Sequence, residues 1–266
     1  MIIHVKGIAA FGPGFENWDT LRSHFRTGTA LNTDFVPVPS GSALPGAERR
    51  RASATVRLAV DIAQGALQQS GMKAKDLATV FASSNGDTNT IHHICDALAT
   101  AERCVSPTRF HNSVHNAPVG YWSIASGSMQ PSSSLCAMSN TFAAGLVEAA
   151  TQSLAEEVAV LLAVFDTPFP EPLYQLTPGR QPFGVSMVLD ADPRGSLAAM
   201  TIDIGPDTQL VTTKMNDPLL ENLRRDSSAS RSLPLLAALA QPMAQQVVLR
   251  YAEDLRIKVS VDRPGP

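Results

Sequence analysis

The sequence has little of several features that mark common classes of protein. It contains three cysteines in 266 residues, an odd number, and no two of them have the C-x-x-C spacing of a metal or redox centre. We therefore expect reduced thiols. Lysine and arginine (21) are slightly outnumbered by aspartate and glutamate (24), for a formal net charge of -3, so the chain offers no basic footprint for nucleic acid.

Long apolar runs are missing as well. The longest, around residues 158–165, is far shorter than the roughly 20 residues that a membrane helix needs. The first residues, Met1–Val5, look like a strand and not like the basic, apolar and small-residue pattern of a secretory signal. From these two observations we expect a cytoplasmic protein without a membrane span.

The sequence does contain alternating strand and helix patterns, and 44% of its residues are hydrophobic. A strand, a helix and a strand follow one another repeatedly, which predicts βαβ crossovers and a three-layer α/β fold with a mainly parallel sheet. Two later segments look like an antiparallel continuation. The strand-like segments are 2–11, 77–82, 158–164, 186–189 and 197–204, and the helical ones include 52–71 and 141–154.

Residues Ser132–Gly145 form the most informative stretch. A strand of small residues runs through a turn into the apolar helix that begins at Thr141. A cysteine at such a junction can stand at the helix N-terminus, where unpaired amides and the macrodipole stabilise a thiolate. Cys136 is therefore a candidate nucleophile, although a buried cysteine that packs as a small hydrophobic residue is the commoner case.

The preceding block, residues 106–125, combines histidine, asparagine, glycine and aromatic side chains. His111 and His115 are four residues apart and could share one face of a helix. No acidic residue or cysteine lies at a supporting spacing for a third ligand. We therefore predict no metal site, and nothing in the sequence indicates a cofactor.

Together these two segments resemble a β-ketoacyl synthase, and in particular the short ketoacyl-synthase-like proteins found beside full-length synthases in aryl-polyene and related pigment pathways. Further matching segments are Val80–Asp87, Phe165–Pro172 and Leu233–Leu239. The resemblance implies a thiolase-like fold, of which residues 1–205 would form mainly the first βαβ half. Residues 206–266 would then be a truncated second half, a C-terminal extension.

The same resemblance bears on catalysis. A decarboxylative condensation needs a nucleophile to carry the acyl chain and donors to stabilise the enolate. In the family the donors are two histidines in the second half, one in a His-Gly-Thr-Gly-Thr motif and one near an Asn-x-x-Phe-Gly stretch. Neither motif is present, and the last histidine is His115. Even the nucleophile position is open, because aligning Gly145 with the helix glycine of the family selects Ala137, whereas the Cys-Ala-x-Ser pattern selects Cys136.

In the family the block before the nucleophile strand lies at the subunit interface and the acyl tunnel. By resemblance, the candidate interface and tunnel residues are Phe110, His111, Asn112, Val114, His115, Asn116, Tyr121 and Met138. The alternative is a polar turn whose hydrogen bonds are satisfied inside one subunit.

The function that the resemblance favours is that of a non-catalytic, chain-length-factor-like subunit. Such a subunit pairs as a heterodimer with a full-length β-ketoacyl-ACP synthase, in fatty-acid or polyketide biosynthesis of the polyene-pigment type, and works with an acyl carrier protein. Two alternatives stay open. One is a stand-alone acyl-thioester enzyme that uses Cys136 for acyl transfer, condensation or hydrolysis, and the other is a homodimeric module that binds acyl carrier protein or a long acyl group.

Overall fold

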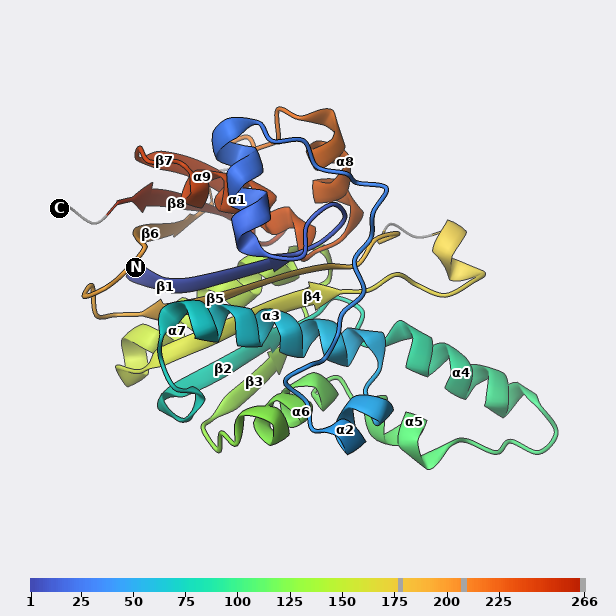
Figure 1. Ribbon diagram of the computed structural model, residues 1–266. Helices are drawn as coiled ribbons and strands as arrows, with labels where there is room; N and C mark the ends of the chain where they lie inside the picture. Colours follow the sequence, from blue (N-terminus) through green and yellow to red (C-terminus); the bar gives the residue numbers. More distant parts are fainter. Residues whose placement is uncertain (177–178, 207–209, 264–266) are drawn as a thin grey trace.

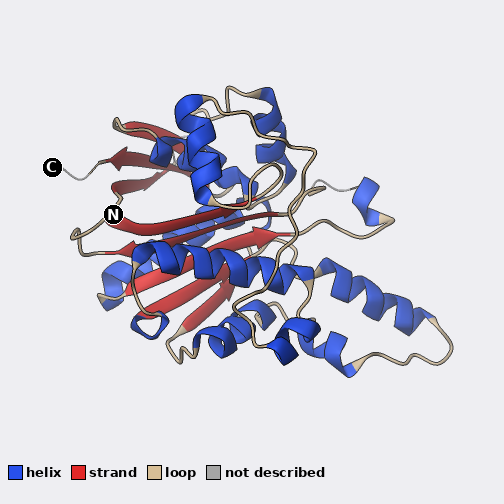
Figure 2. Cartoon of the chain, viewed as in Figure 1, coloured by secondary structure: helices blue, strands red, loops and turns tan. Residues whose placement is uncertain are grey.

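One mixed sheet forms the centre of the molecule (Figures 1 and 2). The computed structural model describes residues 1–176, 179–206 and 210–263. Within these ranges the strands are β1 (Ile2–Phe11), β2 (Leu77–Ala82), β3 (Ser132–Leu135), β4 (Ala159–Asp166), β5 (Phe183–Asp190), β6 (Ala198–Gly205), β7 (Gln245–Arg250) and β8 (Arg256–Asp262). They are ordered β3-β2-β4-β5-β1-β6-β8-β7.

The direction of pairing differs from the prediction. Only β3 with β2 and β2 with β4 are parallel, and the other five neighbouring pairs are antiparallel. The prediction of a mainly parallel sheet is therefore wrong. The physical reason lies in the connections: helices join β2 to β3 and β3 to β4, whereas the connections from β4 to β5 and from β7 to β8 contain no α-helix, so the chain reverses direction.

Helices cover both faces of the sheet, so the predicted three-layer arrangement is confirmed. On one face α3 (Ala54–Ser70) and α6 (Ala117–Ser126) pack in one core with the strands. On the other face α7 (Thr141–Glu156) and α9 (Leu233–Ala240) belong to a second core. The contact of α3 with β1 is so close that a Cβ at Gly7 would lie 2.2 Å from the carbonyl oxygen of Ala66.

Local capping residues set the ends of the first helix. This helix, α1 (Trp18–Thr27), has Asn17 as its N-cap, whose side chain accepts a hydrogen bond from the Thr20 amide, and Gly28 in the left-handed conformation as its C-cap. The remaining described α-helices are α2 (Gly46–Arg51), α4 (Thr88–Ala99), α5 (Pro107–Asn112) and α8 (Pro218–Asp226). In Figure 1, α4 and α5 form an arm that extends from the body.

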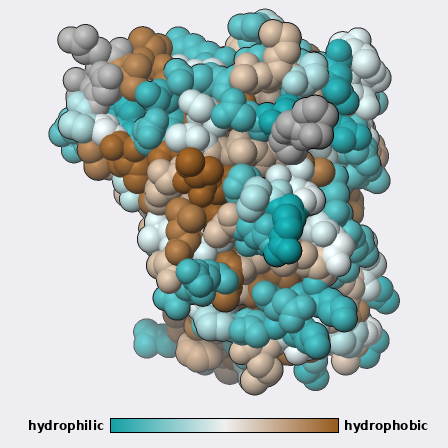
Figure 3. Space-filling model, turned by 90° about the vertical axis from the view of Figure 1, so that its left-hand side faces the viewer, coloured by the Kyte–Doolittle hydropathy of each residue, from teal (hydrophilic) through white to brown (hydrophobic). Residues whose placement is uncertain are grey.

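The residues after 205 contribute to the same sheet. β8 pairs with β6 along its length, and β7 pairs with β8 at the edge. The N-terminus and the end of β8 lie on the same side of the molecule (Figure 1), on a face where hydrophilic and hydrophobic side chains are mixed (Figure 3). The boundary at residue 205 stays a prediction. No described helix is both long and apolar enough to span a membrane.

A buried carboxylate joins the strand ends to the C-terminal part of the chain. Asp166, the last residue of β4, is 1% exposed. One carboxylate oxygen accepts hydrogen bonds from the Ser84 amide (2.9 Å) and from the hydroxyls of Ser83 (3.2 Å) and Ser84 (2.9 Å). The other accepts from the Ser228 hydroxyl (2.6 Å) and the Ala229 amide (3.0 Å). Five donors thus fix the loop after β2 and the segment before α9.

We predict that Asp166→Asn destabilises the protein strongly. In the variant an NH2 group replaces one carboxylate oxygen, so it points at hydrogen-bond donors that have lost their acceptor. Leaving these buried groups unsatisfied should lower the free energy of unfolding by about 2–4 kcal/mol in total. Urea denaturation should show a lower midpoint at an unchanged slope. The matched control is Asp254→Asn, because Asp254 is exposed and its loss should change stability by less than about 0.5 kcal/mol. Equal midpoints for the two variants would contradict this role of Asp166.

Candidate functional site

The candidate site lies where the parallel strands end. β2, β3 and β4 run side by side in the same direction, so the segments that follow them meet at one edge of the sheet. These segments are the loop from Ser83, the turn from Cys136 into α7, and the residues after Asp166. The sequence-predicted junction between strand and helix is therefore at this edge.

Cys136 is exposed at the end of β3. Its Sγ lies 3.2 Å from the carbonyl oxygen of Ser84, to which the thiol donates a hydrogen bond. The helix α7 starts only at Thr141. Cys136 is thus not at the helix N-terminus, where the sequence analysis placed it as a candidate nucleophile.

The strained residue of the junction is Met138. Its φ is +48°, in the left-handed region that a residue with a long side chain rarely adopts. The Thr141 hydroxyl holds the turn, because its Oγ1 accepts from the Ala137 amide at 3.0 Å and donates to the Met138 carbonyl at 2.7 Å. The Met138 side chain is 78% exposed.

A strained turn between a strand and a helix is a known means of presenting a nucleophile. Here the side chain so presented is a thioether, which has no proton to lose and carries no acyl group as an ester or thioester. Sequence reasoning considered Cys136 and Ala137 for this position and assigned Met138 to the tunnel. The φ angle that distinguishes Met138 depends on the folded turn, so the sequence carried no direct signal for it.

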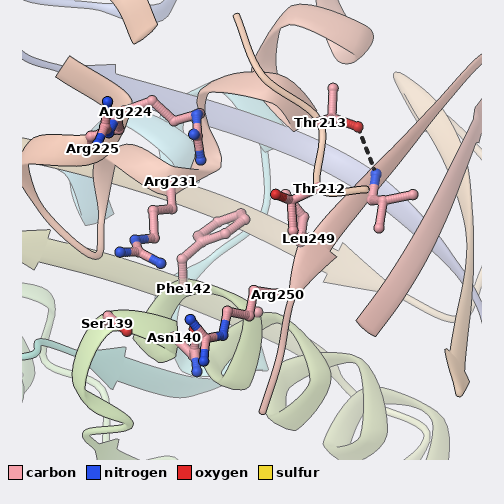
Figure 4. Close-up of a pocket in the computed structure, with 12 residues that line it drawn as sticks. Ser139, Asn140, Phe142, Thr212, Thr213, Arg224, Arg225, Arg231, Leu249 and Arg250 are labelled. Carbon is pink, nitrogen blue, oxygen red and sulfur yellow. Dashed lines mark hydrogen bonds between the residues drawn. The ribbon is translucent and has the colours of Figure 1, made fainter. Parts of the chain in front are cut away.

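Two neighbouring cavities adjoin this turn. One, of about 270 Å³, is lined by Met138 together with Ser84, Asn85 and Phe169. The other, of about 340 Å³, lies at the first turn of α7 and is rich in arginine (Figure 4). Ser139, Arg225 and Arg231 line both. Among the described residues, no histidine lines either cavity.

The block that was predicted to form an interface divides into two parts. Asn112 and Tyr121 are buried inside the subunit. The Asn112 amide donates to the Arg51 carbonyl at 2.9 Å, and its oxygen accepts from the Tyr121 hydroxyl at 3.0 Å. Burial raises the pKa of Tyr121 above its ordinary value of 10.0, although the hydrogen bond with Asn112 opposes this shift. These two side chains support α5 and α6 from within.

The exposed part of the block forms an apolar groove. Phe110 is 67% exposed, Val114 52% and Ile124 55%, and they line a hollow of about 480 Å³. The other candidate residues in the lining are His111, Asn116 and the buried Tyr121. We call this surface the α5–α6 groove; it is lined by Pro107, Phe110, His111, Val114, Asn116, Ala117, Gly120, Tyr121 and Ile124.

His115 does not line the groove. Its Nε2 lies 3.0 Å from the carbonyl oxygen of Ser83, in the loop after β2. His111 is in α5 whereas His115 follows that helix, so the two do not share a helix face as the sequence allowed. The described part of the chain contains no group of three histidine, cysteine or acidic side chains arranged to hold a metal ion.

Comparison with known proteins identifies relatives of this structure. The family model described as "Beta-ketoacyl synthase, N-terminal domain" matches residues 24–253. A ketosynthase (ApeO) in complex with its chain length factor (ApeC) from Xenorhabdus doucetiae is similar at 25% identity and a TM-score of 0.74, with 98% of this chain and 99% of the matched chain covered. No match was found among curated proteins.

Two further solved structures share the fold. The ishigamide ketosynthase/chain length factor has a TM-score of 0.75 at 12% identity, with both chains covered completely. The ketosynthase from module 6 of the bacillaene synthase from Bacillus subtilis 168 has a TM-score of 0.66 at 10% identity, and this chain, covered completely, spans 71% of it. The fold is thus the thiolase-like fold of the ketosynthases. Because the family model covers most of the sequence, the chain belongs to the β-ketoacyl synthase family through its N-terminal domain.

Proposed function

We propose that this protein is a non-catalytic, chain-length-factor-like subunit that pairs with a full-length ketosynthase and acts with an acyl carrier protein in the cytoplasm. The single observation that carries the proposal is the side chain at the strained turn. A condensing enzyme needs a nucleophile there, and this chain presents Met138. The likeness to a ketosynthase in complex with its chain length factor supports the same conclusion.

The described lining of the cavity beside Met138 also lacks the residues that would stabilise the enolate formed in the condensation. A ketosynthase that removes CO2 must stabilise the resulting enolate with preorganised donors. The cavity beside Met138 has Ser84, Asn85 and Phe169 in its described lining, and no histidine. His115, the last histidine of the sequence, is engaged with the Ser83 carbonyl. A stand-alone enzyme based on Cys136 is disfavoured because Met138, not Cys136, occupies the strained turn, and the Cys136 thiol donates a hydrogen bond to the Ser84 carbonyl.

The surface that we assign to pairing consists of the α5–α6 groove and the free edge of β3. In the described part of the chain β3 pairs only with β2, and an unpaired edge strand is a ready site for association. The helix α6 leads into β3 and lies beside it (Figure 1). Phe110 and Val114 are large exposed side chains whose burial against a partner is favourable.

Such a subunit can set product length sterically. In a close-packed interface, a growing acyl chain stops when its end meets a side chain that cannot move. Phe110 is the largest exposed apolar side chain of the groove, and we assign it this role at the end of the tunnel.

The first test concerns catalysis. We expect the purified subunit not to condense malonyl and acyl thioesters, and Cys136→Ala to behave like the wild type. Introducing a thiol through Met138→Cys places it at the turn, close to the first amides of α7, where thiolates are stabilised. Peptide-level mass spectrometry should then show faster alkylation at position 138 than at Cys136. Product formation by the lone wild type that Cys136→Ala abolishes would overturn the proposal.

The second test concerns pairing with the ketosynthase that copurifies from the native cell. Val114→Asp should weaken pairing at least ~100-fold, because an unpaired charge in a desolvated interface costs several kcal/mol. Val38→Asp is the control, since Val38 is 84% exposed and lies outside the groove. Light scattering on mixtures of the two proteins gives the comparison. Tyr121 is unsuitable for this test, because it is buried within the subunit.

The third test concerns product length. Phe110→Ala should leave the heterodimer intact and lengthen its products, because a smaller side chain lets the acyl chain extend further. Mass analysis of the products and light scattering on the same samples measure both quantities. Products of unchanged length from an intact Phe110→Ala heterodimer would remove Phe110 from the tunnel. A normal homodimer with no bound synthase would favour the binding-module alternative.

A further inference from the structure

The arginine-rich cavity at the first turn of α7 is distinct from the α5–α6 groove and has no role in the proposed pairing. Four arginines from three separate segments converge on it. Arg224 and Arg225 come from α8, Arg231 from the short helical turn Ser230–Ser232, and Arg250 from the end of β7. In Figure 4, Arg231 lies between the two arginines of α8 and Arg250, beside Phe142.

The charges around this cavity are not balanced within the described residues. Arg224 forms two hydrogen bonds with Glu221, at 2.6 and 2.7 Å, and this contact lowers the pKa of Glu221 to about 2. For Arg225, Arg231 and Arg250 the described part of the chain provides no carboxylate partner. The nearby Asp226 is occupied elsewhere, because its two oxygens accept from the amides of Gly179 and Gln181.

Arg231 is the most constrained of the four. It is half-buried, and burial together with the charges of Arg224 and Arg250 lowers its pKa from the ordinary value of 12.5. Placing cations close together and partly out of water is unfavourable unless an anion joins them. Three unpaired guanidinium groups around one hollow of about 340 Å³ therefore favour a compact ligand that carries more than one negative charge.

The rest of the lining supplies uncharged donors. The first turn of α7 reaches the cavity at Phe142 and Ala143, and no side chain caps this 16-residue helix. The Thr141 amide already donates to the Met138 carbonyl, but the positive end of the helix dipole still favours an anion. Asn140 also lines the cavity, and its buried Oδ1 has no partner among the described groups. A half-turn of this amide presents Nδ2 as a further donor.

We infer that this cavity binds a phosphate group, either as free phosphate or as the phosphorylated end of a small molecule. Arginine matches the geometry of phosphate oxygens with two parallel hydrogen bonds, and the helix N-terminus adds backbone donors. The volume exceeds that of one phosphate, which leaves room for a short attached group. The site is built by α7, α8 and β7, so its occupation is independent of pairing through α5, α6 and β3.

The test uses the purified chain with inorganic phosphate and with glycerol 3-phosphate, at constant ionic strength set with sodium chloride. Isothermal titration calorimetry should show saturable binding, and the melting temperature should rise with ligand concentration by mass action. Equal affinity for the two probes would show that inorganic phosphate alone is enough for binding. Tighter binding of glycerol 3-phosphate would show that the ligand is a phosphate ester.

Two variants assign the binding to the cavity. Arg231→Gln and Arg250→Gln should each weaken it at least ~10-fold, because each removes a charge-assisted contact. Arg250 is exposed, so its replacement keeps the test valid if Arg231→Gln fails to fold. Arg49→Gln is the matched control, since Arg49 is exposed and outside the cavity lining. The inference is overturned if the wild type shows no saturable binding up to about 10 mM of either probe, or if Arg250→Gln binds like Arg49→Gln.

Discussion

The buried carboxylate of Asp166 is the constraint on which the β3–α7 junction and the arginine-rich cavity both depend. Among the described residues no cation forms an ion pair with it, and five hydrogen bonds from serine hydroxyls and backbone amides hold it. On one side it fixes Ser84, whose carbonyl oxygen accepts a hydrogen bond from the Cys136 thiol. On the other it fixes Ser228 and Ala229, directly before the turn that carries Arg231. One side chain thus positions the β3–α7 junction and the arginine-rich cavity relative to each other.

Much of the local structure could be predicted from the sequence, because caps and periodicity are local signals. Asn17 and Gly28, residue types that commonly begin and end helices, bound α1. The pairing direction could not be predicted, because it depends on how each connection crosses the sheet. The strand β8 alternates apolar and polar residues from Arg256 to Asp262, and its three buried positions are Ile257, Val259 and Val261. This alternation could have identified a strand, but the charged residues between the buried positions partly hid it.

The site was predictable only in outline. The sequence located the turn between strand and helix, but the residue that it presents is decided by the φ of Met138, which contacts with Thr141 maintain. Asn112 and Tyr121 form a hydrogen bond with each other inside the subunit, as the alternative of an internally satisfied polar turn allowed, although Tyr121 also lines the α5–α6 groove. The arginine-rich cavity had no linear signal, because its lining residues are spread from Ser139 to Arg250 and meet only in the folded chain.

The arrangement also explains why the fold does not depend on which side chain stands at the strained turn. The donors that Asp166 binds are serine hydroxyls and amides, so this network stabilises the strand ends whichever side chain stands at position 138. Met138 is mostly exposed, and exchanging an exposed side chain there removes little packing energy. The groove lies on α5 and α6, which are separate elements. A change of side chain at the turn therefore leaves the surface that we propose for pairing unchanged, so the shape of this fold does not depend on the chemistry available at position 138.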